Sequence, residues 1–255
     1  MNELESTKGN KNKEEGVYMD KIKLFIFDMD GLMFDTGRLA YRAYLKSAKK
    51  HDYEVTHNVY YYLTGRTEKD IRQCMEELYG ADVPYNEWRD SINEFKDEIL
   101  EHEKRVYKKT GLVELLQFAK NHGIKVAIAS STHREKVRYY LEIEGVSECF
   151  DIIVAGDEIT NSKPDAEIFL TACEKAGIAP NHAVVFEDSA AGIEAARRAE
   201  ITSFLVEDDI TYLPTRKGRY ALQKNLSHLK AEPTPADYQF LNLLEVRNYL
   251  AKKQV

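Results

Sequence analysis

The chain has 255 residues, of which 43% are hydrophobic and 31% are charged, and its formal net charge is -7. This composition is typical of a globular protein with one large domain, or with a core domain and a smaller module. The negative net charge argues against a nucleic-acid partner. No apolar run approaches the roughly 20 residues that a membrane-spanning helix needs.

Residues 1–20 are polar and contain no apolar stretch of the kind that a secretory signal requires. We expect a disordered extension there, with Met19 as a second candidate for the natural start. The three cysteines, Cys74, Cys149 and Cys173, are scattered and lack the spacing of metal ligands. They suit a reducing compartment, so we expect a cytoplasmic protein.

Short, continuous apolar runs recur along the rest of the chain and are typical of strands buried on both faces of a parallel sheet. These predicted strands cover residues 22–27, 124–129, 151–155, 183–186 and 202–206. Segments with helical periodicity alternate with them. This alternation predicts a doubly wound, Rossmann-like α/β sheet with helices on both faces.

The ends of several helices are marked by their residues. Thr132 followed by Glu135 predicts a capping box, Pro164 suits the first turn of a helix, and Ser189 is a helix cap. Gly123, Gly145 and Gly177 are expected stops.

The segment 37–106 breaks the alternation, because it is charged and reads as several helices without a convincing buried strand. We therefore predict a helical domain at 37–106, inserted after the first strand of an α/β core formed by 21–36 and 107–255. Residues 209–236 read as irregular, and a final helix is expected after Pro235.

The first predicted strand leads into Asp28, Met29, Asp30 and Gly31. Residues two apart on a strand point to one face, and ligands of open α/β sheets bind at the carboxyl ends of the strands. Two nearby carboxylates repel each other unless a cation compensates. By itself, this pattern is equally typical of a polar exit from a strand.

A second acidic pair, Glu187 and Asp188, follows the predicted strand 183–186. Alone it could simply complement the positive end of the next helix. Together with Asp28 and Asp30, however, it concentrates negative charge at one sheet edge. A hard cation with oxygen ligands would compensate for this charge, and Mg²⁺ is the usual ion where phosphate shares the coordination.

Two other strand ends offer groups that bind phosphate. Ser130 and Ser131 follow the strand 124–129, where hydroxyls and helix N–H groups can hold phosphate oxygens. Lys163 precedes another helix and supplies a compact positive charge. Each could be an ordinary cap or surface residue, but their combination with the two acidic pairs favours chemistry on a phosphate group.

In order and spacing, these four strand ends resemble the four motifs of the haloacid dehalogenase superfamily. The subgroup resembles the β-phosphoglucomutase-like phosphatases, which carry a helical cap after the first motif. The likeness covers nearly the whole chain from about Lys21. It implies a magnesium-dependent phosphatase that hydrolyses a small phosphorylated metabolite through an aspartyl phosphate.

The resemblance also implies residue roles. Asp28 is the expected nucleophile, and Asp30 the expected general acid and base. The groups expected to bind Mg²⁺ are Asp28, the backbone carbonyl of Asp30, Glu187 and Asp188. The groups expected to hold the phosphoryl group are Ser130, Ser131 and Lys163. Arg66 lies in a segment that resembles the substrate-facing loop of the cap, although a solvent-facing arginine beside a turn is an equal alternative.

The closest alternative is a sugar-phosphate mutase of the same family. Known mutases carry a histidine, a lysine and an arginine that support return of the phosphate, and this chain has Ala40, Thr64 and Glu68 there. A phosphate-sensing module is less favoured, because receiver domains carry their acidic pair at the first strand and the phosphorylated aspartate at the third. We expect a monomer or a weak dimer.

Overall fold

The computed structural model describes residues 21–55, 68–208 and 235–253. Arg66 and Thr64 therefore lie outside the described residues. Within the described part of the chain, no helix is long and apolar enough to span a membrane.

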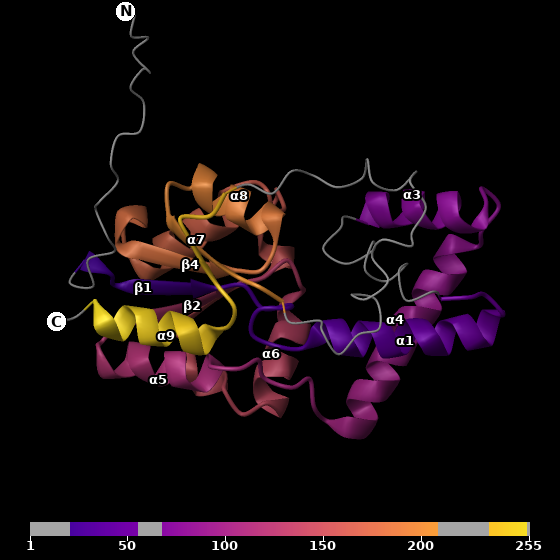
Figure 1. Ribbon diagram of the computed structural model, residues 1–255, viewed down its shortest axis with the longest axis horizontal. Coiled ribbons are helices and arrows are strands. Elements are labelled where there is room, and N and C mark those ends of the chain that lie inside the picture. Colours follow the sequence, from indigo (N-terminus) through magenta and orange to yellow (C-terminus); the bar gives the residue numbers. More distant parts are fainter. Residues whose placement is uncertain (1–20, 56–67, 209–234, 254–255) are drawn as a thin grey trace, which may run out of the picture.

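Six parallel strands form one sheet in the order β3-β2-β1-β4-β5-β6 (Figure 1). The strands are β1 (Leu24–Phe27), β2 (Lys125–Ala129), β3 (Ile152–Val154), β4 (Ala183–Glu187), β5 (Thr202–Val206) and β6 (Tyr238–Phe240). The first five coincide with the predicted strands to within two residues at each end. The short edge strand β6 was not predicted, because its three residues are only partly buried or exposed.

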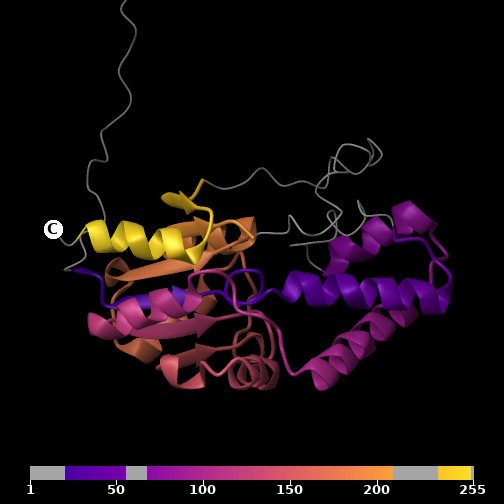
Figure 2. The same ribbon diagram turned by 60° about the horizontal axis from the view of Figure 1, so that its bottom comes forward.

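Helices cover both faces of the sheet, as a doubly wound fold requires (Figure 2). Leu24 and Ile26 of β1 point to the face covered by α7 and α8, whereas Phe25 and Phe27 point to the other face. The helices of the core are α5 (Leu112–Asn121), α6 (Arg134–Ile143), α7 (Glu167–Ala176), α8 (Ala190–Arg198) and α9 (Leu243–Lys252). The fold class is confirmed.

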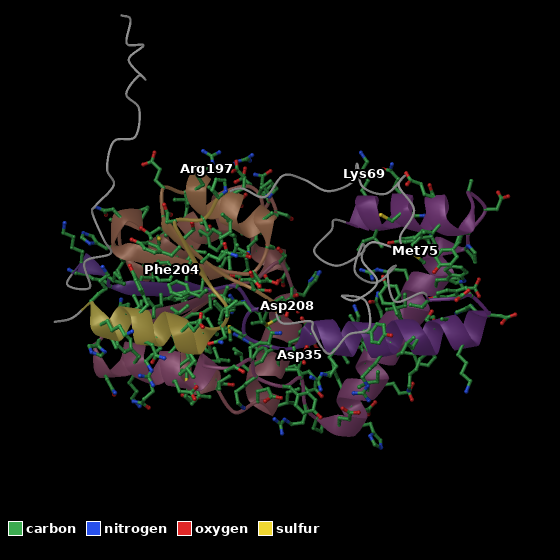
Figure 3. All side chains as sticks on the ribbon, viewed as in Figure 1. Asp35, Lys69, Met75, Arg197, Phe204 and Asp208 are labelled. Atoms are coloured by element: carbon green, nitrogen blue, oxygen red, sulfur yellow. The ribbon has the colours of Figure 1, made fainter. Side chains whose placement is uncertain are left out.

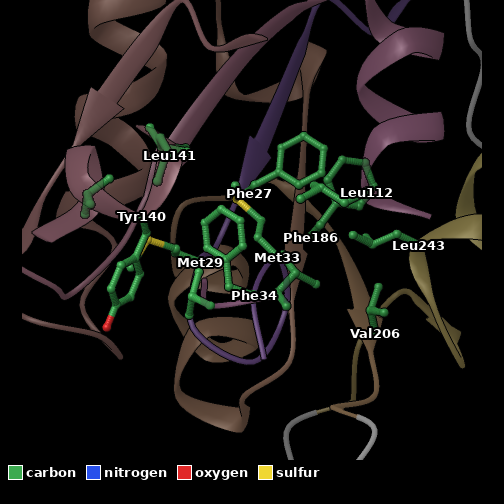
Figure 4. Close-up of a cluster of buried hydrophobic side chains, with 14 of the residues drawn as sticks. Phe27, Met29, Met33, Phe34, Leu112, Tyr140, Leu141, Phe186, Val206 and Leu243 are labelled. Carbon is green, nitrogen blue, oxygen red and sulfur yellow. The ribbon is translucent and has the colours of Figure 1, made fainter. Parts of the chain in front are cut away.

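The face that carries Phe27 is filled by large apolar side chains directly beneath the carboxyl end of β1 (Figure 4). The rings of Phe27 and Phe186 lie 4.8 Å apart, and Met29 and Phe34 are fully buried. This cluster fixes the backbone from which Asp28 and Asp30 project.

Of the helices that the described residues form between β1 and β2, the three before α5 extend away from the sheet edge (Figures 1 and 2). They are α1 (Thr36–His51), α3 (Glu68–Tyr79) and α4 (Tyr85–Glu103). Tyr53 stacks on Trp88 with 3.7 Å between ring centroids, and the Ser47 hydroxyl donates to the Trp88 carbonyl. These helices make up most of the described part of segment 37–106.

Two local expectations were wrong. The helix α6 begins at Arg134 after His133, and Thr132 does not cap it, because its hydroxyl instead donates to Asp30. The Arg134 N–H donates to the side chain of Asp157. The helix α7 begins only at Glu167, so Pro164 precedes the helix rather than occupying its first turn. The Ser189 cap is confirmed, since its hydroxyl accepts a bond from the Gly192 N–H.

Candidate active site

The carboxyl ends of three neighbouring strands bring the predicted groups together. Asp28 directly follows β1, Ser130 follows β2, and Glu187 is the last residue of β4. Since β1 lies between β2 and β4, these three positions meet at the middle of the sheet edge. Such edges are where α/β proteins bind their ligands.

Carboxylate oxygens of Asp28, Glu187 and Asp188 all lie within 4.8 Å of one another. Asp28 and Glu187 are buried, and Asp188 is half-buried. Buried carboxylates this close repel each other, so the arrangement needs compensating positive charge.

Lys163 supplies part of that charge. Its Nζ donates to Asp28 Oδ1 at 2.5 Å, to Glu187 Oε1 at 2.7 Å and to the Ala129 carbonyl at 3.1 Å. Its side chain is only 7% exposed. Burial alone would lower the pKa of Lys163, but the charges of Asp28 and Glu187 outweigh it and raise that pKa above its ordinary value. Lys163 therefore stays protonated.

One lysine does not balance three carboxylates. Burial raises the pKa of Asp28 to about 7; Lys163 opposes the shift, while Glu187 and Asp30 add to it. Burial also raises the pKa of Asp188, with Glu187 and Asp28 acting in the same direction. The oxygen donors and the uncompensated charge both fit a divalent cation.

Glu187 is completely buried, and both of its oxygens are engaged. While Oε1 accepts from Lys163, Oε2 accepts from the N–H and the hydroxyl of Ser189 at 2.7 and 2.8 Å. Gly192 allows this approach, since a Cβ there would lie 1.8 Å from Glu187 Oε1. Glu187 is therefore held rigidly between the lysine and the start of α8.

Asp30 lies outside the carboxylate cluster. Its Oδ2 accepts a 2.8 Å bond from the Thr132 hydroxyl, and it is not among the clustered acids. The strand β1 ends at Phe27, so the strand alternation from which a shared face was expected does not extend over Asp28 and Asp30. Asp30 is thus placed apart from Asp28, next to a hydroxyl that orients it.

Gly31 lets the loop turn close to the cluster. It has a φ of 85°, and a Cβ there would lie 2.2 Å from Asp188 Oδ2. A side chain would therefore both strain the backbone and displace the carboxylate.

The two serines that follow β2 differ in exposure. Ser130 is 1% exposed, and its Oγ accepts from the Thr132 N–H, whereas Ser131 is exposed. Both stand at the edge that carries Asp28. The predicted site residues thus all lie at this edge of the sheet, except Arg66, which is outside the described residues.

Sequence reasoning missed Asp208, which stands two residues beyond β5 at the same edge (Figure 3). Its Oδ1 accepts from Lys109 Nζ at 2.5 Å, and its charge adds to the raised pKa of Asp188. An acid after a buried strand was the available signal, as it was for Asp28. The partner Lys109, 99 positions away in the chain, has no local signal.

Residues 25–206 match the model of the haloacid dehalogenase-like hydrolases, and the chain belongs to this family. It is 36% identical to the phosphorylated carbohydrates phosphatase of Thermotoga maritima, over 69% of this chain and 81% of that protein. It is 27% identical to the validoxylamine A 7'-phosphate phosphatase of Streptomyces hygroscopicus, over 70% of this chain and 83% of that protein.

Among solved structures, it resembles a Thermotoga maritima protein described provisionally as a beta-phosphoglucomutase. The TM-score is 0.68 at 29% identity, over 91% of this chain and 99% of that one. The family resemblance seen in the motifs is confirmed. The family and its phosphatase members support the conclusion that the chain is a phosphatase enzyme.

Proposed function

We propose that the chain is a magnesium-dependent, cytoplasmic phosphatase that hydrolyses a small phosphorylated metabolite through an aspartyl phosphate on Asp28. The observation that carries this proposal is the contact of Lys163 with both Asp28 and Glu187 inside a cluster of three carboxylates. An isolated surface lysine or a helix-end acid would not be buried in this arrangement.

The donor set fits Mg²⁺. Asp28, Asp188 and the backbone carbonyl of Asp30 would hold the ion, with Glu187 completing the negative charge around it. When bound, the ion neutralises these carboxylates and draws charge from the phosphoryl oxygens. Lys163 supplies the remaining positive charge at the same point.

The chemistry itself falls to the residues of the chain. A carboxylate oxygen of Asp28 attacks phosphorus and forms a new P–O bond as the ester P–O bond breaks. Asp30 gives its proton to the leaving oxygen and then takes one from water, which attacks phosphorus and releases inorganic phosphate and free Asp28. Ser130, the Ser131 N–H and Lys163 hold the transferred group.

The placement of Asp30 supports this division of labour. Its carboxylate is separate from the cation cluster and is oriented by the Thr132 hydroxyl. A carboxyl that must both donate and accept a proton benefits from such separation, since bound cations favour the ionised form.

We also propose that residues 37–106 act as a cap that covers the site and selects the substrate, above a core of 21–36 and 107–255, with 1–20 as an extension. Arg66 remains the candidate for contact with the substrate. The name of the Thermotoga maritima relative makes phosphorylated carbohydrates the first class to test. We propose a monomer or a weak dimer that binds neither nucleic acid nor membrane.

The mutase remains the second candidate, because the Thermotoga maritima neighbour is described as a beta-phosphoglucomutase. Two residues argue against a mutase: Ala40, which is half-buried in α1, and Glu68 at the start of α3. At these positions the known mutases carry side chains that support return of the phosphate.

A panel of phosphorylated metabolites with Mg²⁺ separates the two functions. We expect multiple turnovers that release inorganic phosphate from at least one monoester without a bisphosphate activator. Isomerisation of β-glucose 1-phosphate with negligible phosphate release would overturn the phosphatase proposal. A single phosphorylation without turnover would instead indicate a phosphate-sensing module.

A further inference from the structure

Lys96 occupies a position on α4 where the helical pattern calls for an apolar side chain. It stands four residues after Ile92 and four before Leu100, both of which are buried. Residues four apart lie on the same face of a helix. The half-buried side chain of Lys96 therefore belongs to the inward face of α4 rather than to its solvent face.

Within the described residues, Lys96 has no hydrogen bond or ion pair, whereas Lys46 and Lys50 of the same helical segment each pair with a glutamate. Burial lowers the pKa of Lys96 to about 8, and the charges of Arg89 and Lys136 act in the same direction. The acids Asp30 and Asp97 oppose the shift. A half-buried cation that no group of the described residues neutralises is available to an anionic ligand.

Two contacts with the core flank Lys96. Lys136 of α6 pairs with Asp97 at 3.0 Å, and the Tyr139 hydroxyl donates to the Leu100 carbonyl at 3.4 Å. These contacts hold this part of α4 against α6. Lys96 consequently lies at the junction of the helical segment and the core, within electrostatic reach of Asp30.

Tyr140 of α6 offers a second polar group at this junction. Its ring packs edge-on against Phe34, with 6.2 Å between centroids. Figure 4 shows its hydroxyl directed away from the buried apolar cluster. In the described part of the chain, this hydroxyl has no hydrogen-bond partner. Phe34 in turn forms an isolated bridge with Asp30, so Tyr140 packs next to the loop that carries this carboxylate. Burial raises the pKa of Tyr140, and the charge of Asp30 acts in the same direction.

We propose that Lys96 and Tyr140 form a leaving-group subsite beside Asp30, for phosphate esters whose leaving group carries a second acidic group, a carboxylate or a phosphate. This rests on the proposed function, in which Asp30 protonates the leaving oxygen. Groups gathered around Asp30 therefore face the leaving group. Lys96 pairs with its acidic group, and Tyr140 donates a hydrogen bond to it.

Matched pairs of esters test this subsite. Glycerate 3-phosphate has a carboxylate where glycerol 3-phosphate has a hydroxymethyl group, and the bisphosphate and monophosphate of propane-1,3-diol differ by one phosphate. Both pairs are compared in the wild-type protein and in Lys96→Met, which keeps a long side chain suited to a half-buried helix position. Lys136→Met is the control, because it removes a neighbouring charge that pairs with exposed Asp97.

We expect Lys96→Met to lower kcat/KM roughly 10- to 100-fold for the acidic ester of at least one pair, mainly through KM. The neutral esters and the Lys136→Met variant should change little. The pair that responds identifies whether the acidic group is a carboxylate or a phosphate. Tyr140→Phe should weaken the same preference by a smaller factor while keeping the ring against Phe34.

Binding gives a reading that does not depend on turnover. Calorimetry with Mg²⁺ measures the affinity of Asp28→Asn for each ester, with and without Lys96→Met. If acidic and neutral esters respond equally to Lys96→Met, the subsite is wrong, whatever the activity. If Lys96 governs binding of an acidic ester but the wild-type protein releases no phosphate, only the phosphatase proposal fails.

Discussion

The carboxyl edge of the sheet and the helical segment hold their side chains by different forces. At the edge, Lys163, Asp28 and Glu187 form a buried chain of charged contacts of 2.5–2.7 Å. In the helical segment, Tyr53 and Trp88 stack in an apolar cluster, while ion pairs such as Lys46–Glu98 are exposed. Exposed pairs contribute little to stability, roughly 0–1 kcal/mol.

This difference has a functional consequence. The buried charged cluster depends on its one lysine, because removal of Lys163 would leave Asp28 and Glu187 uncompensated. A helical segment stabilised by apolar packing can change its inward polar residues without disturbing the chemistry. On the proposed function, we expect the sheet edge to define the reaction and the helical segment to be the place where substrate preference varies.

The largest effect is expected at the sheet edge, from Asp28→Asn. The amide cannot form the acyl phosphate, so phosphatase activity should fall by roughly 10³-fold or more. The melting temperature should not fall, because the substitution relieves repulsion among three buried carboxylates. Substantial turnover by a verified Asp28→Asn protein would contradict the covalent mechanism.

Removal of the cation should have nearly as large an effect. Activity should vanish with a chelator and return with Mg²⁺, whereas Ca²⁺, which favours more ligands and longer bonds, should substitute poorly. Because Mg²⁺ would bind only the folded protein, it should also raise the free energy of unfolding, by about 2.7 kcal/mol at a free Mg²⁺ concentration 100 times its Kd. Asp188→Asn should remove most of that gain, and full activity in excess chelator would show that the acids have another role.

A third prediction concerns Glu144, which joins the two regions. Its buried carboxylate accepts bonds from Arg105, from the N–H groups of Val106 and Tyr107, and from Lys108, on the segment that returns from α4 to the core. Burial alone would raise the pKa of Glu144, but these donors outweigh it and lower it to about 2.

Because the folded pKa lies below the ordinary value of 4.5, this stabilisation is present above about pH 4.5 and is lost as the pH falls toward 2. Glu144→Gln should lower the free energy of unfolding at pH 7 by roughly 2–3 kcal/mol, and the difference should shrink in acid. Denaturant unfolding between pH 7 and 3 measures this, with exposed Glu142→Gln as control. A difference that does not depend on pH would contradict the electrostatic account.

The smallest effect is expected in the helical segment. If Arg66 contacts the substrate, Arg66→Ala should raise KM several-fold for larger metabolites and leave hydrolysis of acetyl phosphate, which has a very small leaving group, nearly unchanged. Equal losses on both kinds of substrate would place Arg66 in the chemistry instead, and would weaken the contrast between the two regions.

How far sequence predicts structure also differs between the regions. Buried parallel strands are uninterrupted apolar runs, so β5 was predicted at its observed bounds, and Asp28 and Glu187 could be assigned to strand ends. The Thr132 contact with Asp30 was missed because a tertiary hydrogen bond replaced the local cap. The place of Lys96 between Ile92 and Leu100 was visible in the sequence, but its meaning depends on α6 lying against α4.

The central claim is that Asp28 carries the phosphoryl group during turnover. The direct measurement is acid quenching of the wild-type enzyme and Mg²⁺ during turnover of a reactive substrate, followed by mass spectrometry of the peptide that contains Asp28. We predict the added mass of one phosphoryl group on Asp28, absent in Asp28→Asn and removed by hydroxylamine, which cleaves acyl phosphates. Turnover with no phosphorylated Asp28 at any quench time, or with the phosphoryl group on another residue, would contradict the account.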